Sequence, residues 1–194
     1  PSTGGSNVVA ALRYNTTGNY NVAVGTGALA TQATTSYNIG IGYKAGEDIT
    51  TGQQNTAVGS QALMNGTTAA QNVSLGAFTL QTNTTGSFNT AVGNMALYDS
   101  TTSSYNTAVG YQSLQNNTTG AENVAVGSNA LDANTTASYQ TAVGFKALFA
   151  NTTGNANTAI GFETLKTNTV GDRSTAVGYQ ALRDANPSSN ADTY

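Results

Sequence analysis

The chain has 194 residues and a formal net charge of −3, and only 8% of its residues are charged, against about 25% in a typical soluble protein. It contains no His, Cys or Trp, which excludes disulfides, thiolate nucleophiles and imidazole catalysis. The small negative charge argues against a nucleic-acid partner, and no apolar run approaches the ~20 residues needed for membrane insertion.

Ten copies of one 17-residue unit fill the chain, without insertion or deletion between them. One copy begins NTAVGYQSL (Asn106 to Leu114), and a partial copy precedes the first full one at Asn7 to Leu12. An exact short period indicates a solenoid, in which each repeat stacks on the next. Residues 17 apart then lie above one another, and we call each such set a column. The Gly column consists of Gly25, Gly42, Gly59, Gly76, Gly93, Gly110, Gly127, Gly144, Gly161 and Gly178.

The residues within one unit favour a β-solenoid over stacked helices. Gly and adjacent Thr residues are poor helix formers, and 17 residues are too few for a helix pair. The TAVG run alternates polar and apolar residues over a strand length, and NTTG is turn-forming. We therefore predict an all-β fold, a parallel β-solenoid of about eleven coils with two or three short strands each. Residues 1–194 form one domain, with regular repeats over about 7–182 and an irregular tail at 183–194.

Four columns suggest how each coil is built. We expect the Val before each Gly and the Leu four residues after it to fill the core, and the small Ala before Val to mark a crowded face, such as a subunit contact. The Leu column is interrupted only at Gly46, and the Gly column is expected to form a corner. Four residues before Gly, an Asn column predicts an axial ladder of side-chain amides. Its members are Asn21, Asn38, Asn55, Asn72, Asn89, Asn106, Asn123 and Asn157, with Gln140 and Ser174 in the other two coils.

Aromatic residues recur in two columns. The first aromatic column, five residues before Gly, contains Tyr20, Tyr37, Phe88, Tyr105 and Tyr139. The second aromatic column, directly after Gly, contains Tyr43, Tyr111, Phe145, Phe162 and Tyr179. Such rows suit either sugar stacking or packing between subunits, and we favour packing because interfaces are enriched in Tyr and Phe. The second column is our candidate ligand or subunit contact.

Other polar residues carry weaker hypotheses. Asn-x-Ser/Thr sequences favour turns, and in an extracellular chain they are candidate glycosylation sites. Paired Thr residues raise ice binding as a minor alternative, disfavoured because adjacent side chains diverge. Lys146 and Glu163, 17 apart, are expected to pair, whereas Lys166 and Arg183 stack like charges. The candidate glycosylation sites are Asn15, Asn83, Asn117, Asn134 and Asn151.

Catalytic and metal-binding patterns are missing. The nine acidic residues form no column, and the adjacent Glu47 and Asp48 are interpreted as a solvated corner rather than a glycosidase pair. Neither a G-G-x-G-x-D calcium repeat nor a phosphate-binding loop occurs. We therefore predict no enzyme activity, no metal and no cofactor.

The N-[TV]-A-V-G core resembles the N-S-x-A-I-G repeats in the heads of trimeric autotransporter adhesins. The longer motif NTAVGYQSLQNNTTG, residues 106–120, also resembles repeats in bacterial and phage tail-fibre-like proteins. The resemblance covers about Asn7 to Leu182 and implies a trimer at a cell or virion surface. Stalk heptads, a membrane anchor and a C-terminal chaperone-like domain are not seen.

The sequences at the two ends of the chain also bear on its function. Neither end resembles a cap, and Pro187 interrupts the repeat, which predicts either a piece of a longer fibre or end-to-end stacking of copies. Our leading hypothesis is a structural extracellular fibre or filament protein whose partner is itself, associating end to end or laterally. The alternative, from a different class, is an adhesin or tail-fibre head that binds surface glycans.

Overall fold

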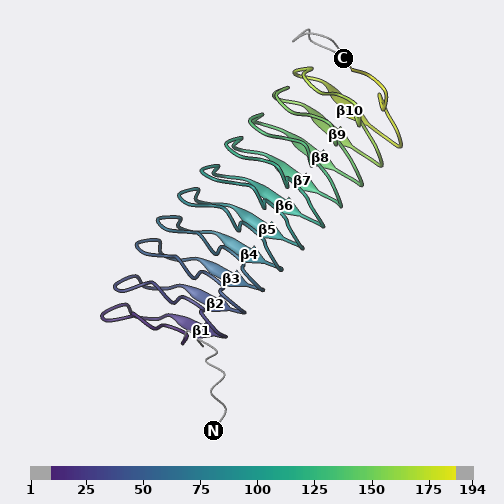
Figure 1. The fold of residues 1–194 in the computed structure, drawn as a ribbon. Coiled ribbons are helices and arrows are strands. Elements are labelled where there is room, and N and C mark those ends of the chain that lie inside the picture. The colour runs from purple at the N-terminus through teal and green to yellow at the C-terminus, as the bar shows by residue number, and fades with distance from the viewer. Residues whose placement is uncertain (1–9, 187–194) are drawn as a thin grey trace.

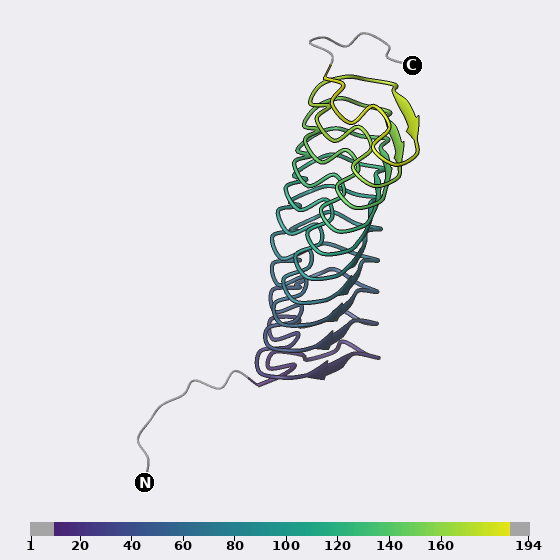
Figure 2. The same cartoon turned by 90° about the vertical axis from the view of Figure 1, so that its right-hand side faces the viewer.

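The computed structural model describes residues 10–186, and in it the repeats form one β-solenoid (Figure 1). Successive coils stack along a single axis, and the view turned by 90° shows the strands superposed along one side of the stack (Figure 2). The predicted all-β solenoid is therefore confirmed. Asn7, Pro187 and the end of the tail lie outside the described residues.

Each coil contributes one strand of three residues, not the two or three strands that we expected. All strands join one parallel sheet in chain order, with residues 17 apart as partners. The sheet corresponds to about nine turns between its first and last strand, and the eleven coils predicted from the sequence also counted the partial repeat at Asn7 to Leu12. The strands are β1 (Val22–Val24), β2 (Ile39–Ile41), β3 (Thr56–Val58), β4 (Val73–Leu75), β5 (Thr90–Val92), β6 (Thr107–Val109), β7 (Val124–Val126), β8 (Thr141–Val143), β9 (Thr158–Ile160) and β10 (Thr175–Val177).

The core is a stripe of Ala and Leu, and here the structure corrects the sequence interpretation. In β6, Ala108 is fully buried, as is Leu114 in the turn that follows. The first and third strand residues point the other way, so that Val109 is only partly buried. The Ala column therefore lies inside and the Val column outside, because the interior of the coil also holds the buried side chains of Leu114, Asn106 and Asn117 and leaves room for only a methyl group on the strand.

One coil fills its core differently. Gly46 replaces Leu there, and Ile49 becomes the fully buried large side chain. A Cβ on Gly46 would lie 2.8 Å from Leu29 Cδ2 and 2.9 Å from Ile49 Cδ1. The missing Leu is thus compensated by Ile49, three residues later.

The turn after each strand has an unusual backbone. Leu114 has φ 51° and Gln112 has φ 55°, and equivalent residues in the other coils share these positive values. This conformation is rare for large side chains. It alternates the direction of the N–H groups, so that Gln112 N donates to Asn94 O of the preceding coil and Leu114 N to Ala130 O of the following one, both at 3.0 Å. Each turn is therefore hydrogen-bonded to both neighbours.

The Gly column is required by close stacking of the backbone. Gly110 has φ 134°, and a Cβ there would lie 2.6 Å from the C and O atoms of Gly127 in the next coil. An L side chain would meet backbone that has nowhere to move. The expected corner is thus also a point of close backbone approach between neighbouring coils.

Candidate functional site

The outer sheet face is the most prominent uncharged surface of the molecule. We define it as the first and third residues of β1 to β10, which are all Val, Ile, Leu or Thr. Several of the aliphatic side chains are well exposed, among them Ile41 at 38%, Leu75 at 38% and Ile160 at 40%. The sequence analysis missed this face because it placed Val inside. The alternation of faces along a strand could have indicated it. Asn106 and Ala108 lie on one face of the strand, and Val109 lies on the opposite face.

The Asn column lies inside the solenoid and holds coils together. Asn106 is 1% exposed, and its Nδ2 donates to Asn89 Oδ1 at 3.2 Å and to the carbonyl of Gly120 at 3.0 Å. Its Oδ1 accepts from the backbone N–H of Asn123 at 3.0 Å. The ladder therefore combines side-chain and backbone partners, and its buried amides have no capacity left for a ligand.

The first aromatic column stacks on itself along the axis. The rings of Tyr20 and Tyr37 are 5.0 Å apart, and those of Phe88 and Tyr105 are 4.8 Å apart with an interplanar angle of 3°. These side chains are nevertheless exposed, Tyr105 at 58%. Stacking occupies one face of each ring in a pair, and the opposite face has no aromatic neighbour within the described part of the chain.

The second aromatic column contains a stack of three and two separate rings. Phe145, Phe162 and Tyr179 stack at centroid distances of 5.3 Å. Tyr43 has the ammonium of Lys44 at 5.7 Å from its centroid. Tyr111 is half exposed, and its axial neighbours are Asn94 and Ser128.

Four of the five candidate glycosylation asparagines are sealed inside the turn. Asn83, Asn117, Asn134 and Asn151 are fully buried, and the Nδ2 of each donates to the carbonyl three residues later. Asn15 makes the same bond, at 3.0 Å to Gly18 O, in a partly buried position. An amide nitrogen used in this way leaves no room for a glycan on the folded chain. The Asn side chains are instead turn-forming.

The Thr pairs of the turns divide into two roles. The first Thr donates its hydroxyl to the next coil, as Thr118 Oγ1 does to Thr135 O at 3.0 Å, whereas the second, such as Thr119, is exposed. The two hydroxyl rows therefore do not form one array of free groups. This geometry agrees with the argument against ice binding at the turns.

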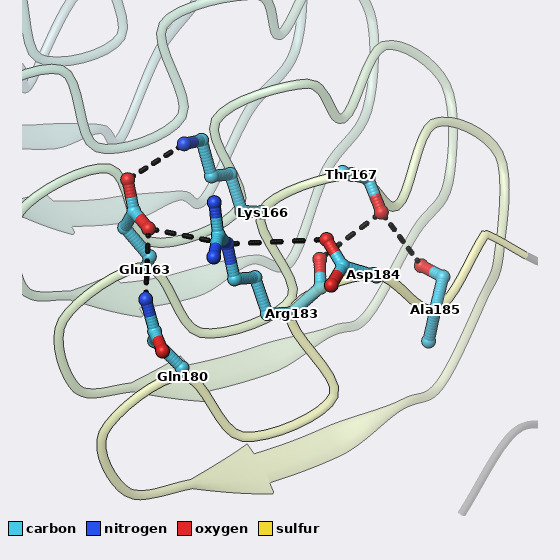
Figure 3. A network of polar contacts seen from close by, with 7 residues as sticks. All are labelled: Glu163, Lys166, Thr167, Gln180, Arg183, Asp184 and Ala185. Atoms are coloured by element: carbon cyan, nitrogen blue, oxygen red, sulfur yellow. Dashed lines mark hydrogen bonds and ion pairs between the residues drawn. The ribbon is translucent and has the colours of Figure 1, made fainter.

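Charged side chains gather at the C-terminal coils (Figure 3). Glu163 Oε1 accepts from Lys166 Nζ at 2.6 Å. Glu163 Oε2 accepts from Gln180 Nε2 at 3.2 Å, and Arg183 Nε lies 3.2 Å from the same oxygen. The expected pairing of Glu163 with Lys146 is replaced by these contacts. The hydrogen bond from Lys166 lowers the pKa of Glu163 below its ordinary value. A single carboxylate thus contacts both members of the stacked Lys166–Arg183 pair and reduces the repulsion between them.

The remaining acidic groups do not assemble a reaction centre in the part of the chain that the structure describes. Burial raises the pKa of Asp99 and Asp132, and burial together with the charge of Glu47 raises that of Asp48. Glu47 is paired with Lys44 at 3.0 Å. Within residues 10–186, no three potential metal ligands lie together, and no helix is long and apolar enough to cross a membrane.

Comparison with protein families, curated proteins and solved structures finds no significant match for this chain.

Proposed function

We propose that this protein is a structural, self-associating solenoid that packs laterally against further copies of itself through the outer sheet face. The supporting observation is the aliphatic column that runs the length of the stack, which is most exposed in the end coils, at Val24 (57%) and Val177 (66%), and partly exposed in the middle, as at Val109. Soluble monomers rarely expose contiguous apolar patches of more than a few hundred Å².

The outer sheet face is a long, narrow strip. Ten strands at about 4.8 Å spacing give a length of about 43 Å, and the three residues of each strand give a width of about 10 Å. The product is about 430 Å² per copy, below the ~600–1,000 Å² that each partner of a standard interface buries, so a stable lateral contact must also bury positions that flank the strands.

The chemistry of the face favours an identical partner. None of its twenty residues is charged, so two copies do not repel each other when they meet. The face also repeats with little change from coil to coil, so the coils of two parallel copies can meet in register along the whole stack. The implied trimer and an extracellular fibre at a cell or virion surface are parts of this proposal that come from the resemblance.

The test is the mass of the assembly in solution. Val109→Lys with Val126→Lys places two charges on the outer sheet face, and we expect it to convert an oligomer into a monomer in sedimentation equilibrium. The control, Thr119→Lys with Thr136→Lys, adds the same charges to exposed turn positions of the same coils and should leave the mass unchanged. A wild-type chain that is monomeric at about 100 µM, a concentration at which typical oligomer interfaces remain assembled, would refute lateral association.

The alternative, a glycan-binding adhesin, is favoured by one residue. Tyr111 is exposed and has no aromatic neighbour above or below it, so its ring faces are open to a sugar. A glycan screen with wild type and Tyr111→Ala tests this function. Binding that Tyr111→Ala abolishes would support it, and a screen without binding would count against it.

A further inference from the structure

A carboxylate interrupts the first aromatic column between two tyrosines. Tyr105, Glu122 and Tyr139 occupy this column in three successive coils. Their backbones have the same conformation, with φ 62°, 59° and 64°, and Tyr105 and Tyr139 are 58% and 62% exposed. All three side chains therefore leave the coil in the same way, at the same surface.

The orientation of the Tyr105 ring defines one wall of the gap between the tyrosines. Tyr105 is stacked almost parallel on Phe88 of the preceding coil, so its other face is directed along the axis toward the coil of Glu122. Tyr139 lies one coil beyond Glu122, and its own next neighbour is Ala156. Two coil spacings separate Tyr105 from Tyr139, about 10 Å.

The spacing of the column suits a cation between the two rings. With both rings oriented as Tyr105 is, a group midway between them would lie about 5 Å from each, inside the ~6 Å range of cation–π attraction. The Glu122 carboxylate stands at that level, and among residues 10–186 its side chain makes no hydrogen bond or ion pair. A quaternary ammonium suits this arrangement because it is weakly hydrated and its methyl groups pack on aromatic faces.

We propose that Tyr105, Glu122 and Tyr139 form a surface slot that binds an organic cation of the quaternary-ammonium type. The inference is independent of lateral association, since the slot lies outside the three strand residues that form the outer sheet face. Each exposed cation–π contact contributes weakly, so dissociation constants in the millimolar range are expected for a small free cation.

The same column provides an internal control. Tyr37 also stacks on one side, on Tyr20, but its other neighbour is the neutral Gln54, followed by Gln71. This part of the column has an aromatic wall without a carboxylate or a second ring. We therefore expect Tyr37 to be insensitive to the cation.

The experiment is a choline titration of the full chain labelled with 3-fluorotyrosine and observed by ¹⁹F NMR. Choline should shift the Tyr105 and Tyr139 signals saturably and leave Tyr37 unchanged, whereas 3,3-dimethyl-1-butanol, its uncharged carbon analogue, should shift none. Glu122→Gln, which keeps the shape of the side chain, should weaken binding about threefold or more. Its intact fold is checked by an unchanged melting temperature.

Three results would overturn the slot. They are the absence of saturable shifts at Tyr105 and Tyr139, equal shifts with the uncharged analogue, and binding that Glu122→Gln leaves unaltered. Sedimentation of the same samples reports the oligomeric state separately, so a failed slot and a failed lateral interface are distinguished.

Discussion

Replacing one column glycine by alanine gives the most direct test of the stacking geometry. In Gly110→Ala, the new Cβ would lie 2.6 Å from the backbone of Gly127, and it must retreat to 3.4 Å to reach an ordinary contact, a movement of about 0.8 Å. The hydrogen bond from Gly127 N to Val109 O, now 2.8 Å, would be stretched out of range by the same movement.

Gly178 provides the matched control for this change. Its φ of 126° is close to that of Gly110, but among the described residues an added Cβ would meet only Ala181 Cβ, at 3.9 Å. Both variants carry backbone strain of about 1–3 kcal/mol. Gly110→Ala alone adds overpacking and a lost hydrogen bond, which together cost about 2–4 kcal/mol.

Urea denaturation followed by circular dichroism measures the difference. Gly110→Ala should have a clearly lower midpoint than Gly178→Ala, and its transition should broaden because a defect in the middle divides the stack into two halves. Equal midpoints for the two variants would refute the argument that backbone contact between coils, rather than φ alone, requires glycine.

Three further predictions concern buried partners. Asn106→Leu leaves the buried backbone N–H of Asn123 without its acceptor and should cost about 1–3 kcal/mol of unfolding free energy, measured by urea denaturation. Ile49→Asn should lower the melting temperature. The double variant Gly46→Leu with Ile49→Asn should recover most of the loss, because it gives this coil the Leu and Asn that coils such as that of Leu114 and Asn117 have at the same positions. Glu163 has a lowered pKa, so its stabilisation is fully present above its ordinary value of 4.5 and is lost as the pH falls through the lower folded value. Calorimetry at pH 7 and pH 3 should show a smaller acid-induced drop in melting temperature for Glu163→Gln than for wild type.

Each of these predictions has its own control. Asn94→Leu changes an exposed Asn of the preceding repeat and should be close to neutral. Gly46→Leu alone should destabilise, since the added side chain meets Ile49; neutrality would contradict the compensation between the two positions. Glu122→Gln removes an exposed carboxylate and should leave the acid sensitivity unaltered. An equal effect of Glu163→Gln would contradict the role of the Lys166 pair.

The repeat period, the fold class and the stacking of equivalent residues in successive coils could be predicted, because they depend only on the spacing of the repeats. Residues 17 apart must occupy equivalent places when no insertion occurs, so a chemical column in the sequence is a column in space. This holds for Asn106, whose partners Asn89 and Asn123 are its sequence equivalents. It also holds for Gly110, whose next neighbour along the axis is Gly127.

The placement of each column inside or outside the coil required the tertiary structure. Hydrophobicity favoured Val109 over Ala108 as the core residue, but the narrow coil accepts only the methyl group at that level and turns Val outward. Leu114 adopts φ 51° against its intrinsic preference, because the hydrogen bonds to both neighbouring coils outweigh the local strain. The sequence by itself therefore determined what stacks on what, since repetition alone enforces it. Only the fold decided which side chains face the solvent, because that depends on the space a single 17-residue coil encloses.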